Sequence, residues 1–177
     1  MLAGSAGCVG VEVGVFEGAF SFDILTTKIA TLHLVNGWVF YPEYGKDSCN
    51  RVDSDQEKIY RNVFNRFGGE IASGRVVVHR KMSVDASKDF EDGSLDFCYL
   101  DARHTFDAVL EDLEAWGPKI KPGGCLMGHD FSDIPQAREL NFGVRPAVEQ
   151  FCNETDWEMY GISEDHPQSF CLKRGAK

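Results

Sequence analysis

The amino-acid sequence predicts an α/β fold of the doubly wound kind, with a mostly parallel sheet of seven strands and helices on both faces. Short apolar runs, typical of buried parallel strands, alternate with segments whose apolar residues recur at helical spacing. This alternation indicates strand–helix–strand units and hence a parallel sheet. The last two runs, 157–162 and 169–173, have no helical segment between them, so they predict an antiparallel C-terminal hairpin.

The N-terminal unit is a predicted strand, helix and strand. Alternating valines indicate a strand at 8–15, a helix is expected at 18–30, and a second strand follows at 31–35. The core stripe of this helix is formed by four apolar residues, Phe20, Ile24, Leu25 and Ile29. Gly14 and Gly18 bracket the turn from the first strand into the helix.

A long loop at 37–52 follows the second strand. A loop of this length inside a compact domain suggests a function. Because the loop leaves the carboxyl end of a strand, we expect its aromatic residues to line a small-molecule pocket. These residues are Trp38, Phe40, Tyr41 and Tyr44. The alternative is a loop that only folds back on the core.

The next segment is predicted to be a helix capped by Asp53 or Ser54 and ended by Gly68-Gly69. Its apolar stripe has four members, Ile59, Val63, Phe64 and Phe67. The β-branched run at 75–79 predicts the third strand, and a short helix is expected at 83–90.

The central unit spans two further strands and the helix between them. An apolar run at 95–100 predicts a strand covered on both faces. The following helix has an apolar stripe of Phe106, Val109, Leu110 and Leu113. Pro118 ends it, the Pro-Gly sequence at 121–124 predicts a reversing turn, and a strand follows at 125–128.

Polar residues stand where these two strands end. Asp101 follows the first of them, and His129 and Asp130 follow the second. Crossover connections between parallel strands are right-handed almost without exception, so both strands should end at the same edge of the sheet. In open α/β sheets this carboxyl edge binds ligands.

The C-terminal part is predicted to be irregular at 131–142 and then helical, with Pro146 in the first turn. The buried face of this helix comprises Val144, Ala147, Val148 and Phe151. With the hairpin at the end, residues 1–177 are expected to form a single domain.

Composition restricts the partners. The net charge of −10 should repel a nucleic-acid backbone and an anionic membrane surface, which favours a small-molecule acceptor substrate. The six cysteines include no CxxC pair, which indicates reduced thiols. No signal peptide and no apolar run long enough to span a membrane is evident, so we expect a cytoplasmic protein with no membrane partner.

The glycine turn after the first strand excludes two ligand classes and points to a third. Phe16 stands where a dinucleotide fingerprint requires glycine, and no Gly-Lys-Ser or Gly-Lys-Thr is present for a phosphate loop. The turn instead reads Glu12-x-Gly14-x-x-x-Gly18-x-x-Ser21.

This turn resembles motif I of the class I S-adenosylmethionine-dependent methyltransferases. Further blocks resemble the family in order and spacing, and together they cover most of the chain from about residue 9: LHLVNGW, SLDFCYLDARHTFDAVLEDLEAW, KPGGCLMGHDF and FGVRPAVEQF. The subgroup resembled comprises small methyltransferases related to sugar and natural-product O-methyltransferases. The resemblance implies a Rossmann-like fold and S-adenosyl-L-methionine as cofactor.

The resemblance also implies cofactor contacts. Glu12 would face the cationic end of the cofactor, Gly14 and Gly18 would allow its close approach, and Asn36 stands where the family has an acidic residue for the ribose. Ser83 matches the position near the adenine. The predicted cofactor-binding set is Glu12, Gly14, Phe16, Gly18, Ser21, Asn36, Trp38, Ser83 and Asp101. The alternatives are a surface carboxylate for Glu12 and a plain helix cap for Ser83.

The strand exits carry the predicted chemistry. Carboxylate and imidazole groups of Asp101, His129 and Asp130 are expected to hold Mg²⁺ or another divalent metal, and the imidazole favours softer ions than Mg²⁺. By resemblance, His104 is the candidate catalytic base. In the alternative interpretation, Asp101 only bonds the cofactor or caps a helix, His104 is a polar first-turn residue and His129 is a packed strand-end residue.

These observations predict a methyltransferase that acts on a hydroxyl of a small molecule, with the help of a divalent metal. One alternative is a non-catalytic S-adenosylmethionine-binding or interaction module on the same fold. An unrelated α/β hydrolase or nucleotide-binding protein is disfavoured, because G-x-S-x-G and phosphate motifs are missing.

Overall fold

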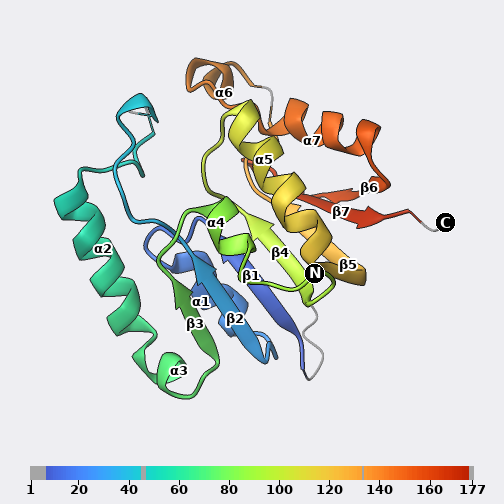
Figure 1. Ribbon diagram of the computed structural model, residues 1–177. Coiled ribbons are helices and arrows are strands. Elements are labelled where there is room, and N and C mark those ends of the chain that lie inside the picture. The colour runs from blue at the N-terminus through green and yellow to red at the C-terminus, as the bar shows by residue number, and fades with distance from the viewer. Residues whose placement is uncertain (1–6, 45–46, 133, 176–177) are drawn as a thin grey trace.

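A computed structural model describes residues 7–44, 47–132 and 134–175, and they form a seven-stranded sheet (Figure 1). The strand order is β3-β2-β1-β4-β5-β7-β6. The strands are β1 (Val9–Val13), β2 (Thr31–Val35), β3 (Val76–His79), β4 (Leu95–Leu100), β5 (Ile120–Gly128), β6 (Trp157–Ile162) and β7 (Phe170–Arg174). Strands β1 to β5 pair in parallel, and β7 is antiparallel to both β5 and β6. The predicted fold class is therefore confirmed.

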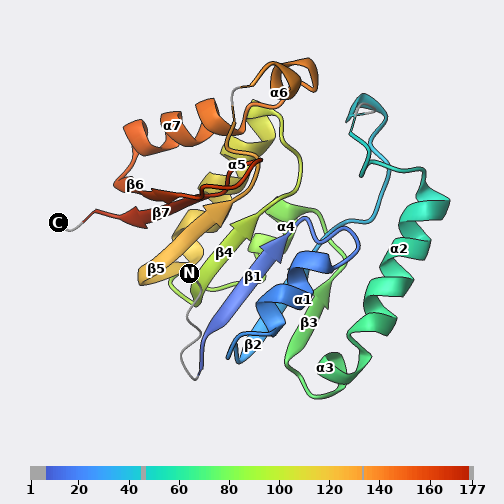
Figure 2. The same ribbon diagram turned by 180° about the vertical axis from the view of Figure 1, so that it is seen from behind.

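Helices cover both faces of the sheet (Figures 1 and 2). The longer helices are α1 (Ala19–Leu25), α2 (Asp53–Arg66), α5 (Phe106–Trp116) and α7 (Val144–Glu154). The short ones are η1 (Pro42–Tyr44), α3 (Gly68–Ala72), α4 (Ser83–Ser87), η2 (Gly117–Lys119) and α6 (Pro135–Glu139). None of the helices within the described ranges combines the length and the apolar character that a membrane span requires.

Two apolar clusters hold these layers together. The first contains residues of α5 and α7 and the faces of β1, β4, β5 and β7 turned toward them. The second contains residues of α1 and α2 and the opposite sheet face. Neighbouring residues of β4 show the division, because Cys98 belongs to the first cluster and Phe97 to the second. A strand buried on both faces explains the continuous apolar run of β4.

Helix α1 is shorter than the predicted 18–30. The Thr26 and Thr27 hydroxyls donate to the backbone carbonyls of Asp23 and Ile24, at 2.7 Å each, and these local bonds compete with a continued helix. Phe20, expected in the core, remains 36% exposed. The centroid of its ring lies 4.3 Å from the ring centroid of Tyr99 on β4. Phe64 on α2 is likewise exposed at 43%, contrary to its predicted place in the core.

The predicted turn at 121–124 is part of strand β5. Gly123 has φ +82°, and a side chain on Gly124 would lie 2.7 Å from the Asp96 carbonyl oxygen. The register of β4 against β5 shifts at this point. The two glycines therefore form an irregularity within a paired strand, because pairing with β4 outweighs the local turn preference.

The carboxyl ends of the central strands meet at one edge, as the right-handed crossover predicts. The Asp101 backbone N–H donates to the Val13 carbonyl at 2.8 Å. The His129 N–H donates to the Leu100 carbonyl at 3.1 Å, and the Gly14 N–H donates to the Val35 carbonyl at 2.9 Å. These bonds join the exits of β1, β2, β4 and β5 into one rim.

Candidate active site at the carboxyl edge of the sheet

The turn after β1 requires glycine at its start. Gly14 has φ +96°, and a side chain there would lie 1.9 Å from the Asp101 carbonyl oxygen. Gly18, with φ +75°, is the N-cap of α1. Phe16 between them also has a positive φ of 45°, although it carries a side chain. Such conformations cost about 1–2 kcal/mol and gather at functional sites.

Glu12 lies at the end of β1 with only 2% of its surface exposed. The Ser21 hydroxyl donates to its Oε2 atom at 2.5 Å. Burial raises the pKa of Glu12 to about 8, the Ser21 bond acts against this rise, and the charge of Asp101 adds to it. The carboxyl is thus mostly protonated at neutral pH, and a cationic ligand would favour its ionised form.

A cavity of about 610 Å³ opens beside the turn. Predicted cofactor residues Gly14, Asn36 and Ser83 lie on its wall, with Met82 and Asp112. The Trp116 indole N–H donates to the Ser83 hydroxyl at 2.9 Å, which fixes Ser83 in place. Burial raises the pKa of Asp112 to about 7, and a hydrogen bond to Ser83 acts in the opposite direction.

A smaller cavity of about 100 Å³ lies next to the first and shares Gly14 and Asn36 with it. Phe16 and Asp101 line this second cavity. Among the described residues, Trp38 lines neither cavity. It is 2% exposed, and its indole N–H donates to the Phe16 carbonyl at 3.2 Å. Trp38 therefore supports the glycine turn from within the core.

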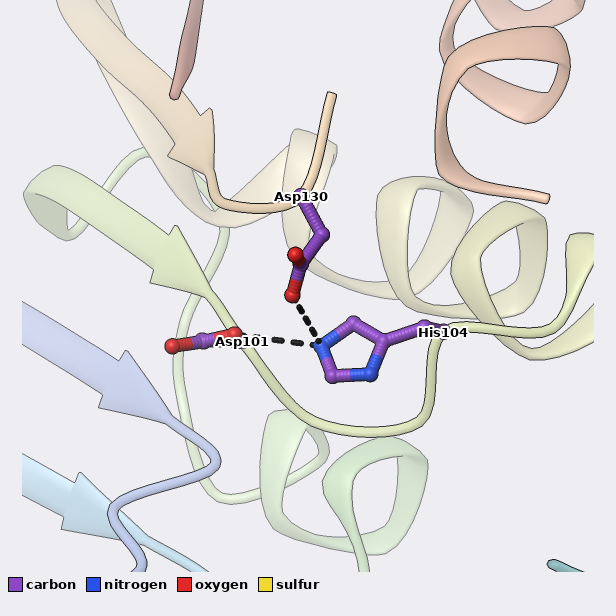
Figure 3. Close-up of side chains that lie close together, drawn as sticks. All are labelled: Asp101, His104 and Asp130. Carbon is purple, nitrogen blue, oxygen red and sulfur yellow. Dashed lines mark hydrogen bonds and ion pairs between the residues drawn. The ribbon is translucent and has the colours of Figure 1, made fainter. Parts of the chain in front are cut away.

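Three titratable side chains converge at the exits of β4 and β5 (Figure 3). The Nε2 atom of His104 lies 3.1 Å from Oδ1 of Asp101 and 3.2 Å from Oδ2 of Asp130. One candidate ligand atom from each of the three residues lies within 4.8 Å of the other two. Two carboxylates and an imidazole at this separation are a suitable donor set for a divalent metal ion.

The other nitrogen of His104 is held by the loop after β2. Nδ1 lies 2.9 Å from the Tyr44 hydroxyl and 3.5 Å from Oδ2 of Asp47. The His104 backbone N–H also donates to the Tyr44 hydroxyl, at 3.0 Å. Asp47 was not predicted as a site residue, although the polar and aromatic loop at the ligand edge was the signal that would have indicated it.

His104 is surrounded by acidic groups, and this sets its charge. Burial lowers its pKa, but the hydrogen bonds to Asp101 and Asp47 and the charges of Asp101 and Asp130 outweigh burial and raise the pKa to about 9. In this arrangement His104 is an imidazolium at neutral pH. It can accept a proton only after it has lost this one.

The predicted metal set of Asp101, His129 and Asp130 differs from the cluster that the structure forms. His129 Nδ1 lies 3.5 Å from Asp130 Oδ2 and 3.9 Å from Asp101 Oδ1, outside the three-residue group. Asp130 has φ 54°, so the chain turns sharply after His129. The loop after β4 brings His104 to the position expected for His129.

The charge on His104 predicts a pH-dependent contribution to stability. With a folded pKa of about 9 against an ordinary 6.5, the contribution is complete below pH 6.5 and is lost as the pH rises through 9. The His104→Gln variant should lack this loss, which is about 3 kcal/mol at most. Urea unfolding at pH 6 and pH 9.5 measures it. The exposed His166→Gln variant is the control, and a His104→Gln variant that keeps the wild-type slope would contradict the assignment.

The sheet order, the glycine turn after β1 and the antiparallel β7 together define the class I methyltransferase fold. The family described as "Methyltransferase domain" matches residues 11–131, and the chain belongs to this family of S-adenosylmethionine-dependent methyltransferases. The family predicted from the sequence is confirmed.

Solved structures are similar over nearly the whole chain. A candidate rRNA methylase from Clostridium thermocellum has a TM-score of 0.66 at 11% identity, over 98% of this chain and 89% of that one. The Podospora anserina methyltransferase PaMTH1, bound to SAH, has a TM-score of 0.63 at 12% identity, over 95% of this chain and 72% of that one. The B. subtilis tRNA methyltransferase TrmK has a TM-score of 0.61 at 11% identity, over 96% of this chain and 61% of that one. At these identities the likeness shows the fold.

One curated relative matches by sequence. The uncharacterized protein y4gI of Sinorhizobium fredii (strain NBRC 101917 / NGR234) is 34% identical over 88 residues. The match covers 50% of this chain and 9% of the relative, so the chain spans only a small part of that protein's length.

Proposed function

We propose that the chain transfers a methyl group from S-adenosylmethionine to a hydroxyl of a small molecule. The observation that carries the proposal is the convergence of three features on one rim. They are the Gly14 turn with the buried Glu12 carboxyl below it, the 610 Å³ cavity, and the cluster of Asp101, His104 and Asp130. The net charge of −10 supports a small-molecule acceptor over a nucleic acid.

The residues on the rim fit the cofactor. The Glu12 carboxyl is buried and bonded to a neutral serine, so an ammonium group nearby would restore its charge. Asn36 offers an amide for ribose hydroxyls, and Ser83 lies on the same cavity wall. When bound, S-adenosylmethionine supplies a methyl group already activated on a sulfonium. The chain therefore has mainly to position the acceptor and to remove its proton.

Asp101, His104 and Asp130 are the residues that would hold a divalent metal. A bound metal would lower the pKa of an acceptor hydroxyl. The proton on His104 and a metal ion compete for the same two carboxylates, because both are cations at that point. We propose that His104 serves as a neutral ligand or as the base only once its proton has been displaced. Deprotonation on metal entry is a common feature of metal sites.

The same charge arrangement favours the second candidate, a non-catalytic S-adenosylmethionine-binding module. The imidazolium of His104 already pairs with Asp101 and Asp130 and balances one of their two negative charges, so the cluster is partly compensated without a metal. The uncharged Asn36 at the ribose position is consistent with weaker cofactor binding. The two candidates differ in whether the cluster binds a divalent ion.

Calorimetric titration of the folded chain with S-adenosylmethionine tests the cofactor assignment, which both candidates share. We expect one molecule bound per chain and a rise in the unfolding temperature. The absence of both binding heat and thermal stabilisation, in a sample shown to be folded, would refute the assignment.

The pKa of Glu12 predicts how cofactor affinity depends on pH. In the free protein Glu12 is protonated below about pH 8, and pairing with an ammonium group requires its ionised form. Affinity should therefore rise roughly tenfold per pH unit as the pH increases toward 8. Over this range, binding should release the Glu12 proton to the buffer. Above pH 8 the ammonium of the cofactor loses its own proton, so the rise should end there.

The Glu12→Gln variant isolates this effect, because an amide cannot ionise. Its affinity should be lower at pH 8 and nearly independent of pH between 6 and 8. Glu17→Gln, in the same turn but exposed, is the matched control and should behave as wild type. Titrations at pH 6, 7 and 8 in two buffers of different ionisation enthalpy measure both affinity and proton release. Parallel pH profiles for wild type and Glu12→Gln would show that Glu12 does not meet the ammonium group.

A further inference from the structure

Half of one sheet face is left without a helix. Helices α5 and α7 cover strands β5, β7 and β6 on one side, whereas on the side of α1 no helix of the described chain lies over these three strands (Figure 2). A hollow of about 660 Å³ lies there, bounded by Phe20 and Ile24 of α1 and by the exposed strand faces. Among the described residues, it shares no lining residue with the two cavities at the carboxyl edge.

Three sulfur-containing side chains line this hollow, namely Cys125 and Met127 of β5 and Cys171 of β7. Met127 and Cys171 are direct partners in the antiparallel register. Cys125 is two residues before Met127, so its side chain points to the same face and is the diagonal neighbour of Cys171. The sheet register therefore gathers two thiols and a thioether in one place.

The surroundings favour a thiolate at Cys125 and not at Cys171. Interaction with the neighbouring Cys171 thiol lowers the pKa of Cys125 below its ordinary value, burial opposes this change, and the nearby charge of Lys173 supports it. The same interaction, together with burial, raises the pKa of Cys171. Cys98 differs, because it is fully buried and packs in the apolar cluster on the other face of the sheet.

A disulfide fits this geometry less well than a shared ligand. Diagonal neighbours on antiparallel strands have Cα atoms about 7–8 Å apart. A disulfide needs about 4.4–6.8 Å. Asp23 is the one carboxylate on the wall of the hollow among the described residues, so hard oxygen-binding ions have little to bind. Thiolate and thioether ligands select soft ions such as Cu(I).

We propose that Cys125, Met127 and Cys171 form a binding site for a soft monovalent metal ion of the Cu(I) class on the open sheet face. The metal would bond to two sulfurs that lose their thiol protons to solvent and to one thioether sulfur that has none to lose. The oxidation state of the metal and of the sulfurs is unchanged. This site is independent of the methyltransferase site and of the function proposed for it.

Anaerobic titration with Cu(I), buffered by a chromogenic Cu(I) chelator, tests the proposal. The background is a variant in which the three cysteines that neither line the hollow nor are fully buried are replaced, Cys8→Ser, Cys49→Ser and Cys152→Ser. We expect this background to keep one tightly bound Cu(I) per chain. Adding Cys125→Ser and Cys171→Ser should lower the affinity at least about a hundredfold, and Met127→Leu about tenfold. Met159→Leu, on the adjoining strand β6, is the control and should change nothing.

X-ray absorption at the copper edge of the loaded background variant gives a readout that does not depend on the folding of the cysteine variants. We expect coordination by sulfur alone, and one sulfur ligand fewer in Met127→Leu. The proposal is overturned if the background binds no Cu(I), if the two cysteine replacements leave the affinity unchanged, or if the absorption spectrum shows only nitrogen and oxygen ligands. Unchanged affinity and spectrum in Met127→Leu would remove the thioether from the site.

Discussion

Replacing Gly14 by alanine is expected to lower the free energy of unfolding by about 3 kcal/mol or more. Two costs add at this residue. The backbone has φ +96°, which disfavours any side chain, and the added Cβ would lie 1.9 Å from the Asp101 carbonyl oxygen. The exits of β1 and β4 would have to separate, and the rim between the two cavities would open. Urea unfolding monitored by circular dichroism measures the change.

Two other glycines separate these costs. Gly74 has φ +76° with open space around it, so Gly74→Ala should show the backbone cost alone, about 1–2 kcal/mol. Gly69 lies in α3 with open space and no positive φ, so Gly69→Ala should be neutral or slightly stabilising. If Gly14→Ala lowers the free energy of unfolding by no more than Gly74→Ala does, the end of β1 does not approach the β4 exit as closely as described.

The Asp130→Asn substitution is expected to have the largest effect on metal binding. It keeps the shape of the side chain but removes one of the two carboxylates that face His104 Nε2. Affinity for Mn²⁺ should fall about a hundredfold. Asp130 lines neither cofactor cavity, so affinity for S-adenosylmethionine should change little. Titration with Mn²⁺ followed by electron paramagnetic resonance, with calorimetry for the cofactor, measures the two effects without knowledge of the acceptor.

Asp107→Asn is the matched control, because Asp107 is an exposed carboxylate in the first turn of α5, three residues after His104, and its replacement should leave Mn²⁺ affinity unchanged. Absence of Mn²⁺ binding in wild type, together with normal cofactor binding, would remove the metal from the account and favour the non-catalytic module. Equal Mn²⁺ affinity in wild type and Asp130→Asn would place the metal elsewhere.

Strong local signals in the sequence predicted most of the fold. Strand β4 was predicted at the bounds that the structure shows, because an apolar run ended by Asp101 leaves little choice. The α5 stripe, with residues at helical spacing, also identified the helix, and Val109 and Leu113 of the stripe are buried. Asp112, expected on the water-facing side, is buried as well. The predictions failed where tertiary contacts outweigh local preference. Pairing with β4 draws the Gly123-Gly124 segment into β5, although its sequence favours a turn.

The site was predicted less completely than the fold, for a physical reason. Strand ends are fixed by topology, so Asp101 and Asp130 were expected at a common edge, where the structure places them. Which imidazole joins them depends on loop conformation, and the sequence carries little information on it. Tyr44 and Asp47 contact His104 from the loop after β2. Tyr44 lies 60 residues before His104 in the sequence, so no local pattern reveals this contact.

The exposure of Phe20 illustrates a further limit. Its spacing on α1 matches a core residue, but the position of a helix over a sheet determines which of its apolar residues are covered. Phe20 instead borders the open face that carries Cys125, Met127 and Cys171. Sequence spacing alone does not distinguish the two cases.

A crystal structure of the chain in complex with S-adenosylhomocysteine and Mn²⁺ tests the central claim most directly. We expect the amino-acid end of the ligand beside Glu12 and the Gly14 turn, its adenine in the 610 Å³ cavity near Ser83, and metal density among Asp101, His104 and Asp130. Ligand density away from this rim, or empty cavities in a sample saturated with the ligand, would contradict it.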